Sequence, residues 1–307
     1  MTDDRIPMID ARAPNATSMP AWIRVRLGTS VQYGSTAAII DGARLNTVCE
    51  EARCPNRGEC WSRGTATFML LGPVCTRACG FCSVKTGRPD WNDADEPRRV
   101  AEAIKAMGLK YVVLTSVNRD DMADGGAAIF AETLRALRVQ NSSIGVEFLT
   151  PDFQYKQDEA VATIGAVLDA VTPHAAGATR LVWGHNVETV PRLYRTARKG
   201  AKYETSLALL ERAATIPGVE AKSALMLGLG ETREEVMQVL RDLREHHVAR
   251  VSLGQYLRPT RDNLPVVEYI HPDRFAEYEQ EAKALGFGWV KAGPLVRSSY
   301  HAEEEQT

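Results

Sequence analysis

The chain has 307 residues, of which 44% are hydrophobic and 25% charged, and its formal net charge at pH 7 is −2. This composition excludes a wholly disordered chain, and the near-neutral charge gives no reason to expect nucleic acid as a partner. We expect no membrane span, because no apolar run approaches ~20 residues. The sequence predicts neither a secretory signal nor a transit peptide, so the expected location is the cytoplasm.

The first 45 residues are expected to be irregular. Pro7, Pro14 and Pro20 interrupt any periodic pattern in this region. The run from Pro20 to Leu27 is short and amphipathic, and it predicts an arm that packs on the rest of the chain.

All six cysteines lie within a window of 34 residues and form two triplets. The triplets are Cys49, Cys54 and Cys60, spaced C-x4-C-x5-C, and Cys75, Cys79 and Cys82, spaced C-x3-C-x2-C. A disulfide framework is disfavoured in a chain of this length without a secretory signal. Zinc matches poorly, because a structural site usually has four ligands, often as two C-x2-C pairs. Iron–sulfur clusters fit the spacing better, although six thiolates around one or two zinc ions remain an alternative.

From about residue 65 onward, strand-like and helix-like stretches alternate. Strands are predicted at 66–71, 111–117, 146–150, 180–184, 222–227, 251–256 and 289–292. Several are almost wholly apolar, as strands buried on both faces should be. Helices are predicted at 97–107, after a capping box at Thr232–Glu235, and at 272–285.

Repeated strand–helix units of about 35 residues predict an α/β fold with a parallel sheet, and most simply a (β/α) barrel. In such a barrel, active residues gather at the C-terminal ends of the strands. The cysteine loop after Leu71, Asn118 after Val117 and Asp152 after Thr150 all fall at predicted strand ends.

The second triplet resembles the signature of the radical S-adenosylmethionine superfamily. It follows the strand-like run 67–71, and an aromatic residue, Phe81, precedes its last cysteine. The resemblance implies a partial (β/α)6-type barrel in which Cys75, Cys79 and Cys82 hold a 4Fe–4S cluster. S-adenosylmethionine would bind the remaining iron and yield a 5′-deoxyadenosyl radical, with Phe81 among the residues around the cofactor.

The first triplet, followed by Trp61, resembles the auxiliary-cluster motif of the lipoyl synthase family. Further matches occur at 115–121, 149–153, 185–190, 227–232, 255–260 and 293–300, so the resemblance covers about residues 20–301. It implies a second 4Fe–4S cluster on Cys49, Cys54 and Cys60, with Ser299 as fourth ligand. Spacing alone does not separate Ser299 from Ser298.

The resemblance divides the chain into three parts. Residues 1–64 would form an N-terminal extension that carries the auxiliary-cluster motif. Residues 65–285 would form the barrel core, and residues 286–307 a C-terminal segment that closes on the auxiliary cluster.

Several residues near predicted strand ends are candidates for binding S-adenosylmethionine. The resemblance implies that the turn containing Gly228 and Gly230 passes close to the adenine, while a tight strand–helix turn is the alternative. Asn118, Arg119 and Glu147 are expected at strand ends, where the cofactor needs polar partners. Each could instead be a loop residue with its hydrogen bonds satisfied.

The basic residues after the matched run 185–190 suggest a docking surface. They are Arg192, Arg195, Arg198, Lys199 and Lys202. They could steer an acidic carrier domain toward the barrel, and a solvated helix face is the alternative.

The resemblance implies an enzyme, a sulfurtransferase that inserts sulfur at C6 and C8 of an octanoyl chain on a lysine of a carrier protein. General bases cannot activate these positions, because a saturated chain has no acidic protons there. The auxiliary cluster would be the sulfur donor, and two S-adenosylmethionine molecules would be consumed per lipoyl group.

The implied partners are octanoylated carrier domains, either of 2-oxoacid dehydrogenase E2 or of the glycine-cleavage H protein. An electron donor and a protein that assembles or repairs iron–sulfur clusters are also implied. Two alternatives remain: another radical sulfur-inserting enzyme, such as a biotin synthase or methylthiotransferase, and an electron carrier with two clusters. An electron carrier would usually have four cysteines per cluster.

Overall fold

The fold is built around one large mixed β-sheet. The computed structural model describes residues 19–24, 28, 30–90, 93–172, 178–300, 302 and 304. These residues form an eight-stranded sheet in the order β1-β2-β5-β6-β7-β8-β9-β10, and a separate two-stranded sheet of β3 and β4. In the large sheet only β1 is antiparallel to its neighbour, and the other pairs are parallel.

The strands of the large sheet lie close to their predicted positions. They are β1 (Asn46–Thr47), β2 (Thr67–Leu70), β5 (Tyr111–Ser116), β6 (Gly145–Leu149), β7 (Leu181–Gly184), β8 (Val219–Leu227), β9 (Arg250–Gln255) and β10 (Trp289–Gly293). Strands β3 (Val74–Cys75) and β4 (Lys85–Thr86) flank the second cysteine triplet. The order is linear in the described part of the chain, with β1 and β10 at its edges, so the barrel is open as predicted.

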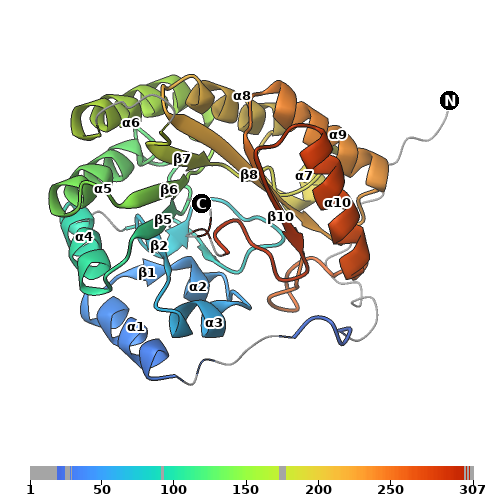
Figure 1. Ribbon diagram of the computed structural model, residues 1–307, viewed down its shortest axis with the longest axis horizontal. Helices are drawn as coiled ribbons and strands as arrows, with labels where there is room; N and C mark the ends of the chain where they lie inside the picture. The colour runs from blue at the N-terminus through green and yellow to red at the C-terminus, as the bar shows by residue number, and fades with distance from the viewer. Residues whose placement is uncertain are drawn as a thin grey trace.

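Helices cover the outside of this sheet. The longer ones are α1 (Val31–Gly42), α4 (Glu96–Ala106), α5 (Ala127–Gln140), α6 (Gln157–Val171), α8 (Tyr203–Ala214), α9 (Arg233–Glu245) and α10 (Pro272–Ala284). The short ones are α2 (Val48–Glu51), α3 (Arg57–Ser62), α7 (Tyr194–Ala197), η1 (Gln154–Lys156) and η2 (Pro191–Leu193). Figure 1 shows α4 to α6 and α8 to α10 in an arc around the strands. No helix in this part of the chain is both long and apolar enough to cross a membrane.

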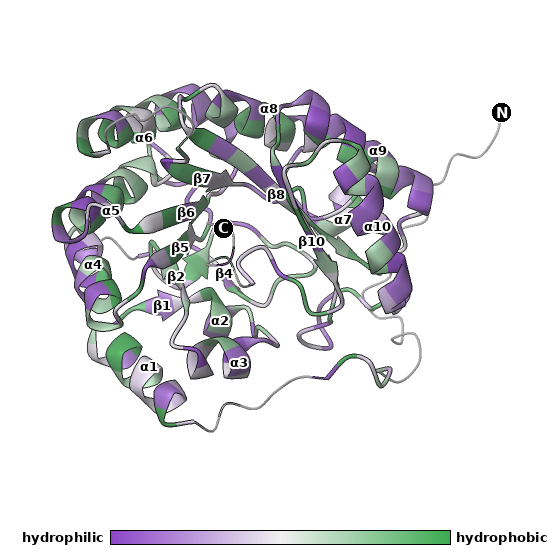
Figure 2. Ribbon diagram, viewed as in Figure 1, coloured by the Kyte–Doolittle hydropathy of each residue, from purple (hydrophilic) through white to green (hydrophobic). Residues whose placement is uncertain are grey.

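The core lies between the strands and the helical arc. Phe68, Leu114, Phe148 and Trp183, from four neighbouring strands, are fully buried. Figure 2 shows apolar colour along the strands and polar colour on the outer faces of the helices. Because the strands are covered on both faces, their sequences read as apolar runs, which explains why they could be predicted.

The expectation that residues 1–45 are irregular is wrong, because α1 lies within them. The Ser30 side chain caps this helix by accepting a hydrogen bond from the Tyr33 amide. Only Thr36 and Ile40 of α1 are buried, so the helix carries no broad apolar stripe that periodicity could reveal.

The predicted N-terminal arm is described only in part. Ile23 is buried, and the Trp22 ring packs edge-on against His271 with centroids 5.0 Å apart. Residues 25–27 of the predicted run lie outside the described residues.

Candidate active site

The second cysteine triplet lies on a loop at the C-terminal end of β2. Backbone amides already point at two of its sulfurs. Cys75 Sγ accepts hydrogen bonds from the amides of Arg77 (3.4 Å) and Asn118 (3.3 Å), and Cys82 Sγ accepts one from Val84 (3.4 Å). Such N–H donors stabilise thiolate sulfur and tune iron–sulfur clusters.

One side chain within this loop ties it to two other strands. Arg77 donates to Asp152 over 2.6 and 2.7 Å and to Asp120 over two distances of 2.9 Å. The pKa of Asp152 is lowered even though burial acts in the opposite direction, because the Arg77 guanidinium is so close. The strand-end placement of Asp152 is therefore confirmed, and its partner is a residue of the cysteine loop.

Beneath this loop lies a buried hydrogen-bonded network centred on Ser206. His185 contacts the Thr150 carbonyl through Nδ1 (2.9 Å) and Ser206 Oγ through Nε2 (3.0 Å). Arg198 donates to the same Ser206 oxygen over 3.0 Å and to the Asn186 carbonyl over 2.9 Å. Burial lowers the pKa of His185 to about 4, so this histidine is neutral at pH 7 and packs inside the fold.

A half-buried carboxylate beside this network, that of Glu188, was missed by the sequence analysis. Glu188 adopts a φ of 66°, in the left-handed region, and its backbone bonds Ala224 and Met226 of β8 over 3.0 and 2.8 Å. Its Oε1 accepts from the Asn186 side chain over 3.1 Å. Burial raises the pKa of Glu188, against the opposing effect of the Arg198 guanidinium. The amide and carboxylate together can bind hydroxyl or ammonium groups.

The first triplet spans two short helices and the connection between them. Cys49 is in α2, Cys60 is in α3, and the Cys54 amide donates to the Cys49 carbonyl over 3.0 Å. All six thiols of the chain are free. Burial raises the pKa of Cys49 in this triplet to about 12, and it raises the pKa of Cys79 in the second triplet to about 11. Thiols of this kind lose their protons when a cationic iron centre binds.

The C-terminal segment contacts the helices that carry this triplet. Figure 1 shows the chain after β10 turning inward toward α2 and α3. Asn56 Nδ2 donates to the Leu295 carbonyl over 2.7 Å, and the Tyr300 hydroxyl donates to Glu59 over 3.1 Å. Asn56 and Leu295 are 239 positions apart in the sequence. The fold therefore brings the C-terminal segment to the first triplet from the far end of the chain.

The two serines of this segment differ in their partners. Ser299 Oγ accepts a hydrogen bond of 2.9 Å from Thr67, the first residue of β2. Ser298 Oγ is buried and has no hydrogen-bond partner among the described residues. The fold thus brings both hydroxyls, one on each of two consecutive residues, to the side of the barrel that holds the first triplet.

Comparison with known proteins decides the family. Residues 69–243 match the profile of the Radical SAM superfamily. The lipoyl synthase of Thiobacillus denitrificans is 51% identical over 288 residues, covering 94% of this chain and 89% of the relative. That of Rubrobacter xylanophilus is 50% identical, covering 93% and 86%, and that of Syntrophotalea carbinolica is 48% identical, covering 98% and 94%. The chain belongs to the lipoyl synthase family.

Solved structures support the fold. Streptococcus suis SuiB bound to its precursor peptide SuiA gives a TM-score of 0.54 at 13% identity, covering 73% of this chain and 48% of that chain. SuiB alone gives 0.53 at 15% identity, covering 77% and 52%. Membership of the radical SAM superfamily implies one 4Fe–4S cluster and S-adenosylmethionine.

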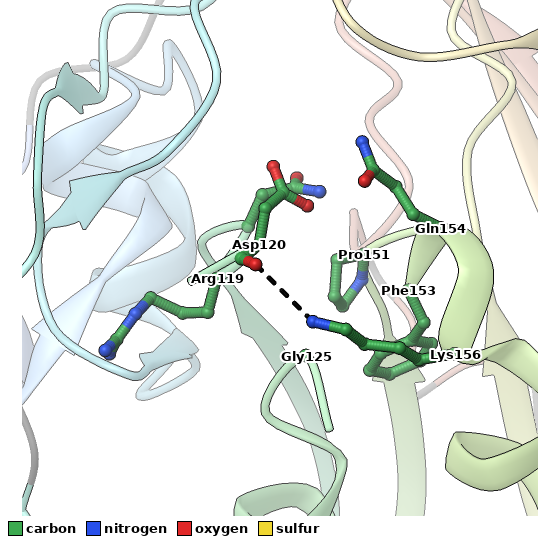
Figure 3. Close-up of a pocket in the computed structure, with 8 residues that line it drawn as sticks. Arg119, Asp120, Gly125, Pro151, Phe153, Gln154 and Lys156 are labelled. Carbon is green, nitrogen blue, oxygen red and sulfur yellow. Dashed lines mark hydrogen bonds between the residues drawn. The ribbon is translucent and has the colours of Figure 1, made fainter. Parts of the chain in front are cut away.

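Asn118 and Phe81, two of the candidate cofactor contacts, both adjoin the second triplet, and their contact with the cofactor stays a prediction. The Asn118 amide contacts Cys75, and Phe81, one residue before Cys82, packs partly buried against the core. Asn118 is one of the residues that line a small pocket. Figure 3 labels the others, which are Arg119, Asp120, Gly125, Pro151, Phe153, Gln154 and Lys156. In this view Lys156 reaches toward the backbone of Asp120.

The expectation that Glu147 lies at a strand end is wrong. It lies in the middle of β6, fully buried, and accepts hydrogen bonds from Lys222 Nζ (2.9 Å) and the Tyr111 hydroxyl (3.2 Å). The Lys222 ammonium also lies 4.9 Å from the centre of the Trp289 ring. Glu147 is thus half of an ion pair inside the barrel wall, which its position in an apolar run could not reveal.

The glycine turn after β8 is tight, as the alternative interpretation held. Gly228 and Gly230 have φ values of 102° and 103°. A Cβ on Gly228 would lie 2.4 Å from the Glu268 carbonyl oxygen, which excludes a side chain. Glu231 accepts from the Leu229 amide over 3.0 Å and also from the Gly228 amide. The turn directly follows β8, and its contact with the adenine stays a prediction.

The basic residues at 192–202 do not form one exposed face. Arg198 is buried, and Arg192 bonds Glu235 over 2.7 and 2.9 Å. Only Arg195, Lys199 and Lys202 of this group are exposed, which leaves a smaller basic surface than the sequence suggested.

Proposed function

We propose that this chain inserts sulfur at C6 and C8 of an octanoyl chain carried on a lysine of another protein. The observation that carries the proposal is the contact between the C-terminal segment and the first triplet, through Asn56–Leu295 and Glu59–Tyr300. A simple radical enzyme needs only the second triplet. A segment that brings two serine hydroxyls toward three further cysteines favours a second cluster with one oxygen ligand.

The three free thiols of each triplet are the ligand type that a 4Fe–4S cluster takes. Cys75, Cys79 and Cys82 would hold one, and the amides that already donate to two of these sulfurs suit thiolate ligands. The free thiols of the first triplet would hold the other, with Ser299 as the fourth ligand. When bound, the two groups supply a carbon-centred radical from S-adenosylmethionine and sulfide for transfer.

The chain's own residues prepare this chemistry. Arg77 fixes the loop of the second triplet to the ends of β5 and β6 through Asp120 and Asp152. A serine oxygen is a harder ligand than thiolate and a poorer match for iron in a sulfide cluster, so we expect it to release more readily. Asn118, Glu188 and the Gly228–Gly230 turn line the strand ends where S-adenosylmethionine would be held. Enclosure within the barrel would keep water from the radical.

The substrate is a protein-bound acyl chain, so a carrier domain must dock at the strand-end side. We propose octanoylated E2 lipoyl domains or the glycine-cleavage H protein as carriers. A reductant and a cluster-repair protein are the other expected partners. Six free thiols favour a reducing compartment such as the cytoplasm.

An anaerobic assay tests the proposal. The reconstituted chain is mixed with S-adenosylmethionine, a reductant and an octanoyl-lysyl peptide, and 5′-deoxyadenosine and the peptide mass are followed. We expect a product that has gained two sulfurs. Replacing Cys49, Cys54 and Cys60 with alanine should leave 5′-deoxyadenosine formation intact and abolish sulfur insertion.

The matched variant replaces Cys75, Cys79 and Cys82 with alanine and should yield neither product. Sulfur insertion by the variant without the first triplet would contradict the assignment of that triplet as the sulfur source. A chain loaded with both clusters that cleaves S-adenosylmethionine but never adds sulfur would contradict the proposed function itself.

A further inference from the structure

The C-terminal segment carries one more charged side chain, and it lacks a carboxylate partner. Arg297 Nη1 donates to the carbonyl of its neighbour Val296 over 2.7 Å. No carboxylate within the described part of the chain forms an ion pair with this guanidinium. Arg77, by contrast, binds two carboxylates. Arg297 is half-buried, and a partly desolvated cation without a carboxylate partner is costly, so its retention points to an anion that binds there.

The backbone around Arg297 is fixed on both sides. Leu295 is bonded to Asn56, and Ser299 is bonded to Thr67. The segment also packs closely against β9 at Gly254. A Cβ at Gly254 would lie 2.0 Å from the Val296 carbonyl oxygen and 3.3 Å from Arg297 Nη1. The guanidinium is therefore placed by the fold next to β9, and it does not extend freely into solvent.

The contacts of this segment place Arg297 beside the helices that carry the first triplet. Leu295, two residues before Arg297, accepts a hydrogen bond from Asn56, which lies between Cys54 and Cys60 in the sequence. Arg297 therefore lies on the part of the C-terminal segment that is fixed between β9 and the first triplet.

We propose that Arg297 is a positioning residue reserved for the auxiliary cluster, holding that anionic group through charge and N–H donation at the point where the acyl chain meets it. This inference rests on the proposed function. A cluster bound by three thiolates and one serine alkoxide carries net negative charge. In an interior of low dielectric, a nearby guanidinium stabilises that charge far more strongly than it would in water.

The reduction potential of the auxiliary cluster tests this role directly. It is measured in a chain whose Cys75, Cys79 and Cys82 are replaced with alanine, so that only the auxiliary cluster titrates. Removing a nearby positive charge disfavours the more negative, reduced cluster. Arg297→Gln should therefore shift the potential to a more negative value, whereas Arg297→Lys should stay close to the parent.

Arg274→Gln serves as the matched control, because the Arg274 side chain is exposed on α10 and pairs with Glu277. It should leave the potential and the sulfur insertion of the full enzyme unchanged. In the full enzyme, Arg297→Gln should slow sulfur insertion by about tenfold or more, the effect of losing one hydrogen bond to a charged group, while 5′-deoxyadenosine release continues.

The possible results distinguish a failure of the role of Arg297 from a failure of the proposed function. Equal potentials in Arg297→Gln and the parent, with a parent enzyme that inserts sulfur, overturn the role of Arg297 and leave the proposed function standing. If Arg297→Gln loses its iron, Arg297→Lys decides: a retained cluster at the parental potential supports the charge role. Loss of iron from both variants overturns it, because lysine carries the same charge.

Discussion

Arg77 and Asp152 are joined by two hydrogen bonds of 2.6 and 2.7 Å although 75 positions separate them in the sequence. Arg77 lies between the first two cysteines of the second triplet, and Asp152 follows β6. Both side chains are nearly fully buried. The shape of the cysteine loop is therefore set by the folded sheet, and a cluster would bind to a loop that is already held in place.

Asp152→Asn should destabilise the chain by about 3 kcal/mol, because it removes one partner of a buried guanidinium. The control is Asp169→Asn, which breaks the pair between Arg180 and an aspartate that is 67% exposed. Exposed pairs contribute roughly 0–1 kcal/mol. Urea unfolding of both variants measures the difference, and equal losses of stability would show that Asp152 does not anchor the loop.

Gly254→Ala should displace the C-terminal segment, because the new Cβ would lie 2.0 Å from the Val296 carbonyl oxygen. A displacement of about 1 Å can cost 10²-fold in rate, so sulfur insertion should fall by about that factor. Iron bound by the first triplet should fall as well. In the control, Gly34→Ala within α1, the new Cβ has nothing within 4 Å, and it should stabilise the helix by roughly 0.5–1 kcal/mol. Full activity of Gly254→Ala would contradict the tail contact.

His185 gives the chain a specific sensitivity to acid. Its pKa is lowered to about 4 by burial, whereas an unfolded histidine titrates near 6.5. Between these values the unfolded chain takes up a proton that the folded chain does not, so stability falls as the pH drops through this window. The His185→Gln variant should lack this part of the loss of stability at low pH. Thermal unfolding of both proteins is followed from pH 7.5 to about pH 4, and the melting temperature is plotted against pH. The same dependence of melting temperature on pH in both proteins would refute the assignment.

Glu147→Gln should act on stability and not on cofactor binding. The change leaves the buried Lys222 ammonium without its carboxylate, which costs about 3–5 kcal/mol. Combining it with Lys222→Met should recover part of this loss, because the buried charge is then removed. Calorimetric titration of the folded variant with S-adenosylmethionine should give parental affinity, and a weakened affinity would restore Glu147 as a cofactor ligand.

Local patterns explain what could be predicted. Strand β5 was predicted because its apolar run reflects burial on both faces, and α9 because Thr232 and Glu235 form the capping box that the sequence shows. The cysteine triplets could be recognised because ligands of one cluster lie close together in the chain. Helix α1 was missed because it has almost no apolar stripe.

Long-range contacts explain what could not be predicted. The pairing of Arg77 with Asp152 depends on how the loop lies over the sheet, and Glu188 reaches the site through a positive φ that glutamate rarely adopts. The position of Arg297 beside β9 requires the C-terminal segment to fold inward. None of these contacts produces a periodic pattern or a fixed motif spacing in the sequence.

The account depends on each cysteine triplet holding its own cluster. Iron and sulfide analysis with Mössbauer spectroscopy, on anaerobically reconstituted protein, measures this directly. We predict about eight irons per chain for the parent and about four for each variant in which one triplet is replaced with alanine. Zinc in place of iron, or about four irons in the parent, would contradict the account.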